Sequence, residues 1–125
     1  MRDIRLWEIL RDVLDDPNDG RTIHQFVFPR QKFRVTTNLI ILAKQYIQDG
    51  KKVIFVTRRG VEASRLRKDH PGLRAVPEAD LGKSLEGNSF DYVIADSYIT
   101  YDTMDAVAEA LDSKTVKKFL KVETK

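Results

Sequence analysis

The sequence predicts an α/β protein: a three-layer α-β-α sandwich with a mostly parallel sheet, in one small domain. Two observations lead to this prediction. Strand-like apolar runs alternate along the chain with segments of helical periodicity. The run VIFV at 53–56 is apolar at every position, which is typical of a parallel strand buried on both faces. Strands that alternate with helices imply crossover connections, and these place helices on both faces of the sheet.

The N-terminal half of the chain supplies the first elements. Residues 3–15 place apolar side chains at helical spacing, and the turn-forming segment DDPNDG ends that helix. The β-rich run 22–28 stops at a proline. A loop then leads to a helix at 36–48, for which Thr36 or Thr37 is the expected N-terminal cap and the following Asp-Gly the end.

The second half repeats the alternation of strand and helix. Its expected elements are a strand at 51–57, an amphipathic helix at 58–70, a short strand at 73–76, a strand at 91–96, a helix at 100–113 and a last strand at 116–123. The segment 82–89, GKSLEGNS, is expected to be a loop. We therefore divide the single domain, 1–125, into an N-terminal helix within 1–16, a core at 22–112 and the last strand at 116–123.

Composition excludes several classes of function. The chain has 125 residues, no cysteine and two histidines, so disulfides, thiolate zinc sites and cysteine nucleophiles are excluded and no metal site is expected. No apolar run approaches the length of a membrane span, and the first ten residues are too charged for a signal peptide. We expect a cytoplasmic protein without a membrane partner.

Charge is distributed unevenly along the chain. The net charge is +3, but the segment 29–68 is strongly basic and the segment 78–112 is strongly acidic. The basic segment favours an anionic partner, DNA or RNA, although solvated charge on exposed faces explains the same pattern. Its candidate nucleic-acid contacts are Arg58, Arg59, Arg65 and Lys68. Phe33, Tyr98 and Tyr101 suit stacking on bases, but packing is the more common role of such residues.

Three strand ends are expected to meet at one edge of the sheet. Ligands of parallel sheets bind outside the carboxyl ends of the strands. Those ends carry Pro29-Arg30-Gln31, Thr57-Arg58-Arg59 and Asp96-Ser97. Arg30, Lys32 and Arg34 add three cations within five residues before a predicted helix, so this loop is a candidate anion site.

The loop FPRQKFRVTT resembles the phosphate loop PRQ-x-G-K-T-T of phage terminase large subunits and superfamily-2 helicase-type ATPases. FDYVIADS resembles the acidic strand of that family, and KKVIFVTRRGVEASRL resembles the strand and helix whose junction contacts nucleic acid there. The resemblance covers about residues 22–112. It implies that Arg30, Gln31, Lys32, Arg34, Thr36, Thr37 and Asp96 stand at positions for nucleotide phosphate and magnesium.

The diagnostic residues of that family have changed. Arg34 stands at a glycine position, Val35 at the position of the phosphate-binding lysine and Ser97 at that of the catalytic glutamate. Valine cannot bind a phosphate and serine cannot activate water as a carboxylate does, and loss of a single preorganised group costs about 10²–10³ in rate. We therefore expect a domain without catalytic residues that needs no cofactor.

The resulting hypothesis is a non-catalytic module that binds nucleic acid or a replication, packaging or transcription protein, of phage or mobile-element origin. Two alternatives stay open. In the first, the chain is an ATPase that uses ATP with magnesium, and Lys32 or Arg34 replaces the missing lysine. In the second, the chain is a pure protein-interaction module. An uncovered edge strand would also favour oligomers.

Overall fold

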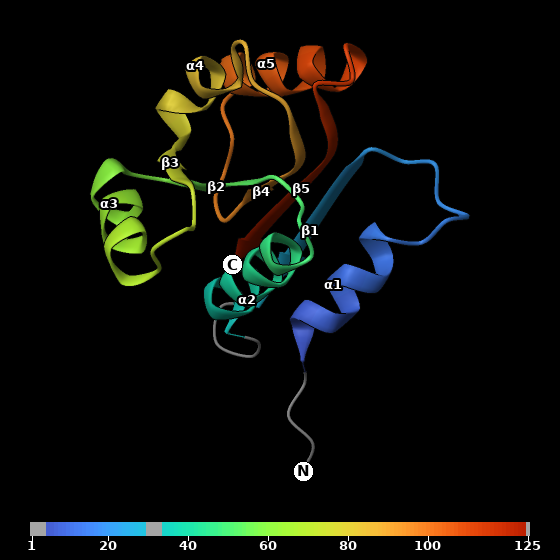
Figure 1. The fold of residues 1–125 in the computed structure, drawn as a ribbon, viewed down its shortest axis with the longest axis horizontal. Coiled ribbons are helices and arrows are strands. Elements are labelled where there is room, and N and C mark those ends of the chain that lie inside the picture. Colours follow the sequence, from blue (N-terminus) through green and yellow to red (C-terminus); the bar gives the residue numbers. More distant parts are fainter. Residues whose placement is uncertain (1–4, 30–33, 125) are drawn as a thin grey trace.

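The computed structural model describes residues 5–29 and 34–124, and the five strands within them form one all-parallel sheet (Figure 1). The strand order is β1-β5-β4-β2-β3. The strands are β1 (Ile23–Phe28), β2 (Val53–Thr57), β3 (Ala75–Pro77), β4 (Phe90–Ala95) and β5 (Val116–Thr124). The predicted α/β class is confirmed, and the sheet is parallel throughout.

Helices cover both faces of this sheet (Figure 1). They are α1 (Leu6–Leu14), α2 (Val35–Gln48), α3 (Gly60–Asp69), α4 (Leu81–Leu85) and α5 (Tyr101–Asp112), with a short 3₁₀ turn at Glu78–Asp80. One apolar cluster joins α1, α2 and α3 to the sheet, and a second joins α4 and α5 to its other face. This arrangement is that of an α-β-α sandwich.

The strand β5 lies between β1 and β4 and therefore belongs to the centre of the core. Phe119 and Leu120 are fully buried on opposite faces of it, in the second and first cluster respectively. Such a buried, two-sided strand stabilises the fold by the apolar area it removes from water, about 25 cal/mol per Å². The position of β5 fixes the distance between β1 and β4, whose carboxyl ends carry the candidate site.

The first helix is held against the second by a tertiary cap. No local side chain caps α1. Instead, Oδ1 of Asn38 accepts a hydrogen bond from the Trp7 N–H at 3.1 Å, and the amide of Asn38 donates to the Arg34 carbonyl at 3.1 Å. A polar residue from α2 thus satisfies one of the free N–H groups at the start of α1.

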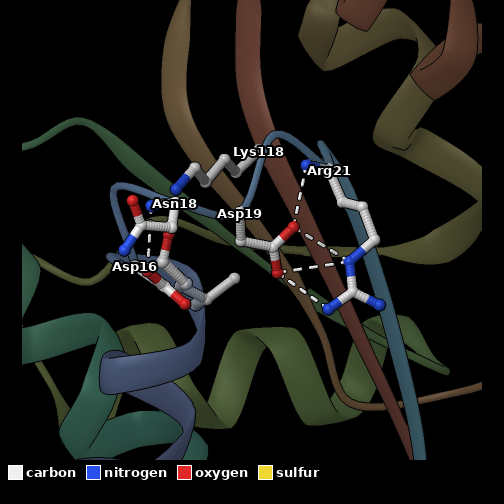
Figure 2. Close-up of polar contacts among 6 residues, drawn as sticks. Asp16, Asn18, Asp19, Arg21 and Lys118 are labelled. Atoms are coloured by element: carbon white, nitrogen blue, oxygen red, sulfur yellow. Dashed lines mark hydrogen bonds and ion pairs between the residues drawn. The ribbon is translucent and has the colours of Figure 1, made fainter.

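The connection from α1 to β1 is organised by its own polar residues (Figure 2). Arg21 donates from Nε and Nη2 to the carboxylate of Asp19, the closest approach being 2.7 Å. Asp16 accepts from the Asn18 N–H at 2.9 Å, and Lys118 of β5 donates to the carbonyl of Leu14. The Arg21 guanidinium holds the pKa of Asp19 well below its ordinary value.

Three local expectations are wrong. The segment 82–89 is not all loop, because Leu81–Leu85 forms α4 and buries its two end leucines. Neither Thr36 nor Thr37 caps α2: the cap position is Arg34, in the left-handed region with φ 46° and no side-chain cap. Tyr98 and Tyr101 are not packed, since they are 59% and 84% exposed.

Candidate functional site

The carboxyl ends of β1 and β4 bring Thr36 and Asp96 together. Thr36 lies in the first turn of α2 and Asp96 directly follows β4, sixty residues further along the chain. The Thr36 hydroxyl donates to the Asp96 carboxylate at 2.6 Å. The residues that the family resemblance assigns to magnesium binding are therefore in direct contact.

Asp96 is a partly buried carboxyl group with a raised pKa. Burial raises its pKa to about 6; the hydrogen bond from Thr36 opposes this rise, and the nearby negative charge of Glu62 adds to it. No described arginine or lysine forms an ion pair with Asp96. Ionisation of a partly buried carboxyl group lowers the stability of the fold. A cation close to the group favours the ionised form.

A cleft of about 790 Å³ opens beside this pair. It lies where the ends of β2, β4 and β5 meet the first turns of α2 and α3, and residues that line it include Thr36, Arg58, Arg59, Asp96, Tyr98 and Thr100. The position is the one at which parallel sheets bind ligands.

The acidic residues of the cleft are mostly engaged by neighbours. Glu62 accepts from Arg59 at 3.0 Å, and Glu123 lies 4.0 Å from the Lys121 ammonium. Glu78 accepts from the hydroxyl and the backbone N–H of Thr100 at 2.6 and 3.1 Å. Burial raises the pKa of Glu78, but the Thr100 and Thr103 hydrogen bonds outweigh it and leave that pKa below its ordinary value.

Four cations form what we call the basic stripe, defined as Arg58, Arg59, Arg65 and Lys68. All four are exposed, and two of them, Arg58 and Arg59, line the cleft. Arg65 and Lys68 are three residues apart on α3 and so share a helix face. Within residues 5–29 and 34–124, only Arg59 of this group forms an ion pair.

The loop before α2 is described only from Arg34 onward. The candidate residues Arg30, Gln31, Lys32 and Phe33 lie outside the described residues. Arg34 is exposed, and its left-handed backbone is the conformation that favours glycine, the residue expected at this position from the family. Val35, at the lysine position, is 3% exposed and packs in the core. Thr37 is exposed and does not line the cleft.

Sequence reasoning missed one wall of this site, and it named Tyr98 as suited to base stacking but more commonly packed. Glu78 and Thr100 form one wall, and the signal for Thr100 was its position as the cap of α5, where it accepts from the Thr103 N–H. Tyr98 also lines the cleft, with the Lys121 ammonium 5.8 Å from its ring centroid. Its exposure could not be read from a run in which aromatic residues usually pack.

Neither a metal cluster nor a membrane span is found in the part of the chain that the structure describes. No group of three or more histidine, aspartate or glutamate side chains there is arranged to hold a metal ion. None of the helices there is both long enough and apolar enough to cross a bilayer. Comparison of the chain with protein-family models, with curated proteins and with solved structures gave no match.

Proposed function

We propose that this protein is a non-catalytic nucleic-acid-binding module built on the frame of a degenerate phosphate-loop ATPase of the terminase or helicase type. The nucleic acid lies along the outer side of α3 and the mouth of the cleft. Its phosphates contact the basic stripe, and its contact is independent of base sequence. The resemblance to packaging ATPases favours an origin in a phage or mobile element.

The observation that carries this proposal is the state of Arg58, Arg65 and Lys68. Each is exposed, and none has an ion-pair partner among the described residues. These three cations lie on α3 and at the strand end before it. Their positive charges can contact the phosphates of a nucleic-acid backbone. Binding of this kind releases counterions and weakens steeply with salt.

The chemistry of the cleft favours a contact at its mouth rather than a deeply bound phosphate. Asp96, Glu62 and Glu78 are carboxyl groups in its wall, and they repel an anion that enters without a cation. Arg58 and Arg59 lie at the strand end that leads into α3, so an elongated anion reaches them from outside. Extended nucleic acid has this shape and can contact the mouth without entering, whereas a small phosphate bound inside the cleft would face these carboxyl groups.

The absence of turnover in this proposal follows from two positions. Val35 is buried and apolar, and Ser97 uses its hydroxyl for a 3.2 Å hydrogen bond to the carbonyl of Tyr98. A phosphate-binding cation and a carboxylate next to Asp96 are what hydrolysis requires. These side chains supply neither.

Fluorescence anisotropy with labelled single- and double-stranded DNA, measured across a salt series, tests the proposal. The variant Arg58→Ala/Arg65→Ala is compared with Lys51→Ala/Lys83→Ala, which removes the same charge from exposed residues elsewhere. Two lost phosphate contacts lower the salt slope by about 1.4 for single strands and about 1.8 for duplex. Undetectable binding at low salt, or equal losses in both variants, contradicts the proposal and favours a protein partner.

A second candidate function is binding of ATP with magnesium, and the 2.6 Å contact between Thr36 and Asp96 favours it. A magnesium ion at this pair would receive a hydroxyl and a carboxylate oxygen, both suitable ligands. Titration with a fluorescent ATP analogue and magnesium checks this candidate. Affinity that falls in Thr36→Ala and Asp96→Asn but not in Thr37→Ala supports it; equal affinity in all three contradicts it.

A further inference from the structure

The two outer strands of the sheet are built differently. β3 has three residues, one of them Pro77, and Nη1 of Arg67 donates to the Ala75 carbonyl at 2.7 Å. A short strand, a proline and a blocked carbonyl all prevent a further strand from pairing at that edge. β1 has six residues, IHQFVF, with no charged residue and no proline. Within the described residues nothing pairs with its outer side.

The hydrogen-bonding groups on that outer side can be assigned from the register. Ile23 is aligned with Phe119, and the Phe119 N–H donates to the Thr22 carbonyl at 2.8 Å. In a parallel ladder the residues of one strand alternate, so His24 and Phe26 direct their backbone groups toward β5. The N–H and C=O groups of Ile23, Gln25 and Val27 therefore point away from the sheet.

The same three residues carry the exposed side chains of the strand. Side chains alternate between the faces of a strand, so Ile23, Gln25 and Val27 share one face. His24, Phe26 and Phe28 share the other, where His24 is buried and both phenylalanines pack on the first apolar cluster. Ile23 and Val27 are 36% and 53% exposed, although both are large apolar residues.

We propose that β1 pairs with β1 of a second copy of this chain, antiparallel and with Gln25 opposite Gln25 of the partner. In this register Ile23 is opposite Val27 of the partner subunit, so each exposed apolar side chain covers another. The outward backbone groups of three residues per chain form six hydrogen bonds across the two-fold axis. The two five-stranded sheets become one continuous sheet of two subunits.

Other registers fit less well. Shifting the pairing by one residue places side chains of opposite faces against each other. Centring it on Phe26 keeps the faces matched but leaves the outward groups of Ile23 unpaired, so four hydrogen bonds replace six. The symmetric contact uses the same surface on both subunits, so the assembly is complete with two copies. The blocked β3 edge prevents further copies from adding to form a fibre.

The charges near the edge permit this contact. Asp19 and Arg21, which precede β1, neutralise each other within their own chain (Figure 2). On the neighbouring strand, Lys121 and Glu123 lie 4.0 Å apart on the face that carries Ile23 and Val27. Two copies therefore approach without an unpaired like charge from these residues.

Single cysteines test the register, because the chain has none of its own. Opposite residues in a hydrogen-bonded antiparallel pair have Cα atoms about 5.5 Å apart, within the range that a disulfide bridges. We expect Gln25→Cys to form a disulfide-linked dimer under mild oxidation. Ile23→Cys and Val27→Cys do not do so alone, since each lies four residues, about 13 Å, from its own counterpart, but a mixture of the two gives the linked heterodimer.

Sedimentation analysis tests the association itself. The wild-type chain is expected to be a dimer that Val27→Lys converts to a monomer with an unchanged circular dichroism spectrum. Val61→Lys is the matched control, because Val61 is 64% exposed on α3, and it stays dimeric. A wild-type monomer at all concentrations, or equal cross-linking of all three single-cysteine variants, overturns the proposal.

Discussion

The two ends of the parallel sheet use the same kinds of residue for opposite purposes. At the amino ends of the strands, Asp15 accepts from the hydroxyls of Tyr46 and Tyr92 at 3.0 and 2.8 Å, and the two rings stack with centroids 3.9 Å apart. At the carboxyl ends, Asp96 accepts a hydrogen bond from one hydroxyl group and Tyr98 is exposed. Arg58 forms no ion pair within the described residues.

The amino end also neutralises its charges. Arg11 lies over the Tyr46 ring, 5.1 Å from its centroid, and pairs with both Asp15 and Asp49. Burial raises the pKa of Tyr92 to about 12, and it also raises the pKa of Tyr46, so both remain hydroxyl donors in the physiological range. The difference teaches that the polar groups of Asp15, Tyr46 and Tyr92 at the amino end are used inside the fold, whereas Arg58 and the ring of Tyr98 at the carboxyl end are exposed to solvent.

The largest expected effect is the loss of an aromatic ring at the amino end. Tyr46 is 1% exposed, so Tyr46→Ala should lower the free energy of unfolding by about 3–5 kcal/mol, because it leaves a cavity. Tyr101→Ala is the matched change at the carboxyl end; this ring is 84% exposed, and the expected effect is within about 0.5 kcal/mol. Urea denaturation measures both, and equal losses would remove the proposed difference between the ends.

A second pair of variants should give effects of opposite sign. Asp15→Asn is expected to lower the free energy of unfolding by about 1–2 kcal/mol, because charge-assisted hydrogen bonds from two tyrosines are weakened. Asp96→Asn is expected to raise it by about 1–2 kcal/mol at neutral pH, because ionisation of the carboxyl group no longer has to occur in a partly buried site. Destabilisation by Asp96→Asn would show that Asp96 is a structural residue.

The pH dependence of this difference follows from the pKa of Asp96. Folding raises that pKa from 3.8 to about 6, so the folded chain binds the proton more tightly. The associated stability is fully present below 3.8 and is lost as the pH rises through about 6. The advantage of Asp96→Asn over wild type should therefore shrink steadily between pH 7 and pH 4. An advantage that is constant over this range would exclude ionisation as its cause.

The smallest expected effect concerns the backbone at the start of α2. Arg34 occupies the left-handed region, which costs a non-glycine residue about 1–2 kcal/mol. Arg34→Gly relieves this strain but makes the unfolded chain more flexible, so we expect a net gain of about 0.5 kcal/mol in thermal or urea denaturation. Arg34→Ala leaves a non-glycine residue in the left-handed region and should give no gain in stability. A gain of the same size in Arg34→Ala would show that removal of the positive charge, and not relief of backbone strain, causes the effect.

The sequence predicted much of the fold because the apolar pattern that favours a strand or a helix lies within that element's own residues. The run 53–56 is fully buried as β2, and the last strand forms as β5. The helix α4 was missed because five residues, including Gly82, are too short for a periodic pattern to stand out. The predicted threonine cap of α2 is wrong because the helix already begins at Val35, and the Thr36 hydroxyl donates to Asp96, a partner sixty positions away that no local pattern contains.

The sequence by itself determined which segments become strands and helices, since apolar periodicity and turn residues act within a few positions. It also indicated Arg58, Arg65 and Lys68 as candidate nucleic-acid contacts in a basic segment, and the structure then showed that all three are exposed. Only the tertiary structure decided that β5 separates β1 from β4, that Thr36 contacts Asp96, and that β1 is left at an edge. The physical reason is that strand pairing and burial depend on residues distant in the chain, and these set the surroundings of each side chain.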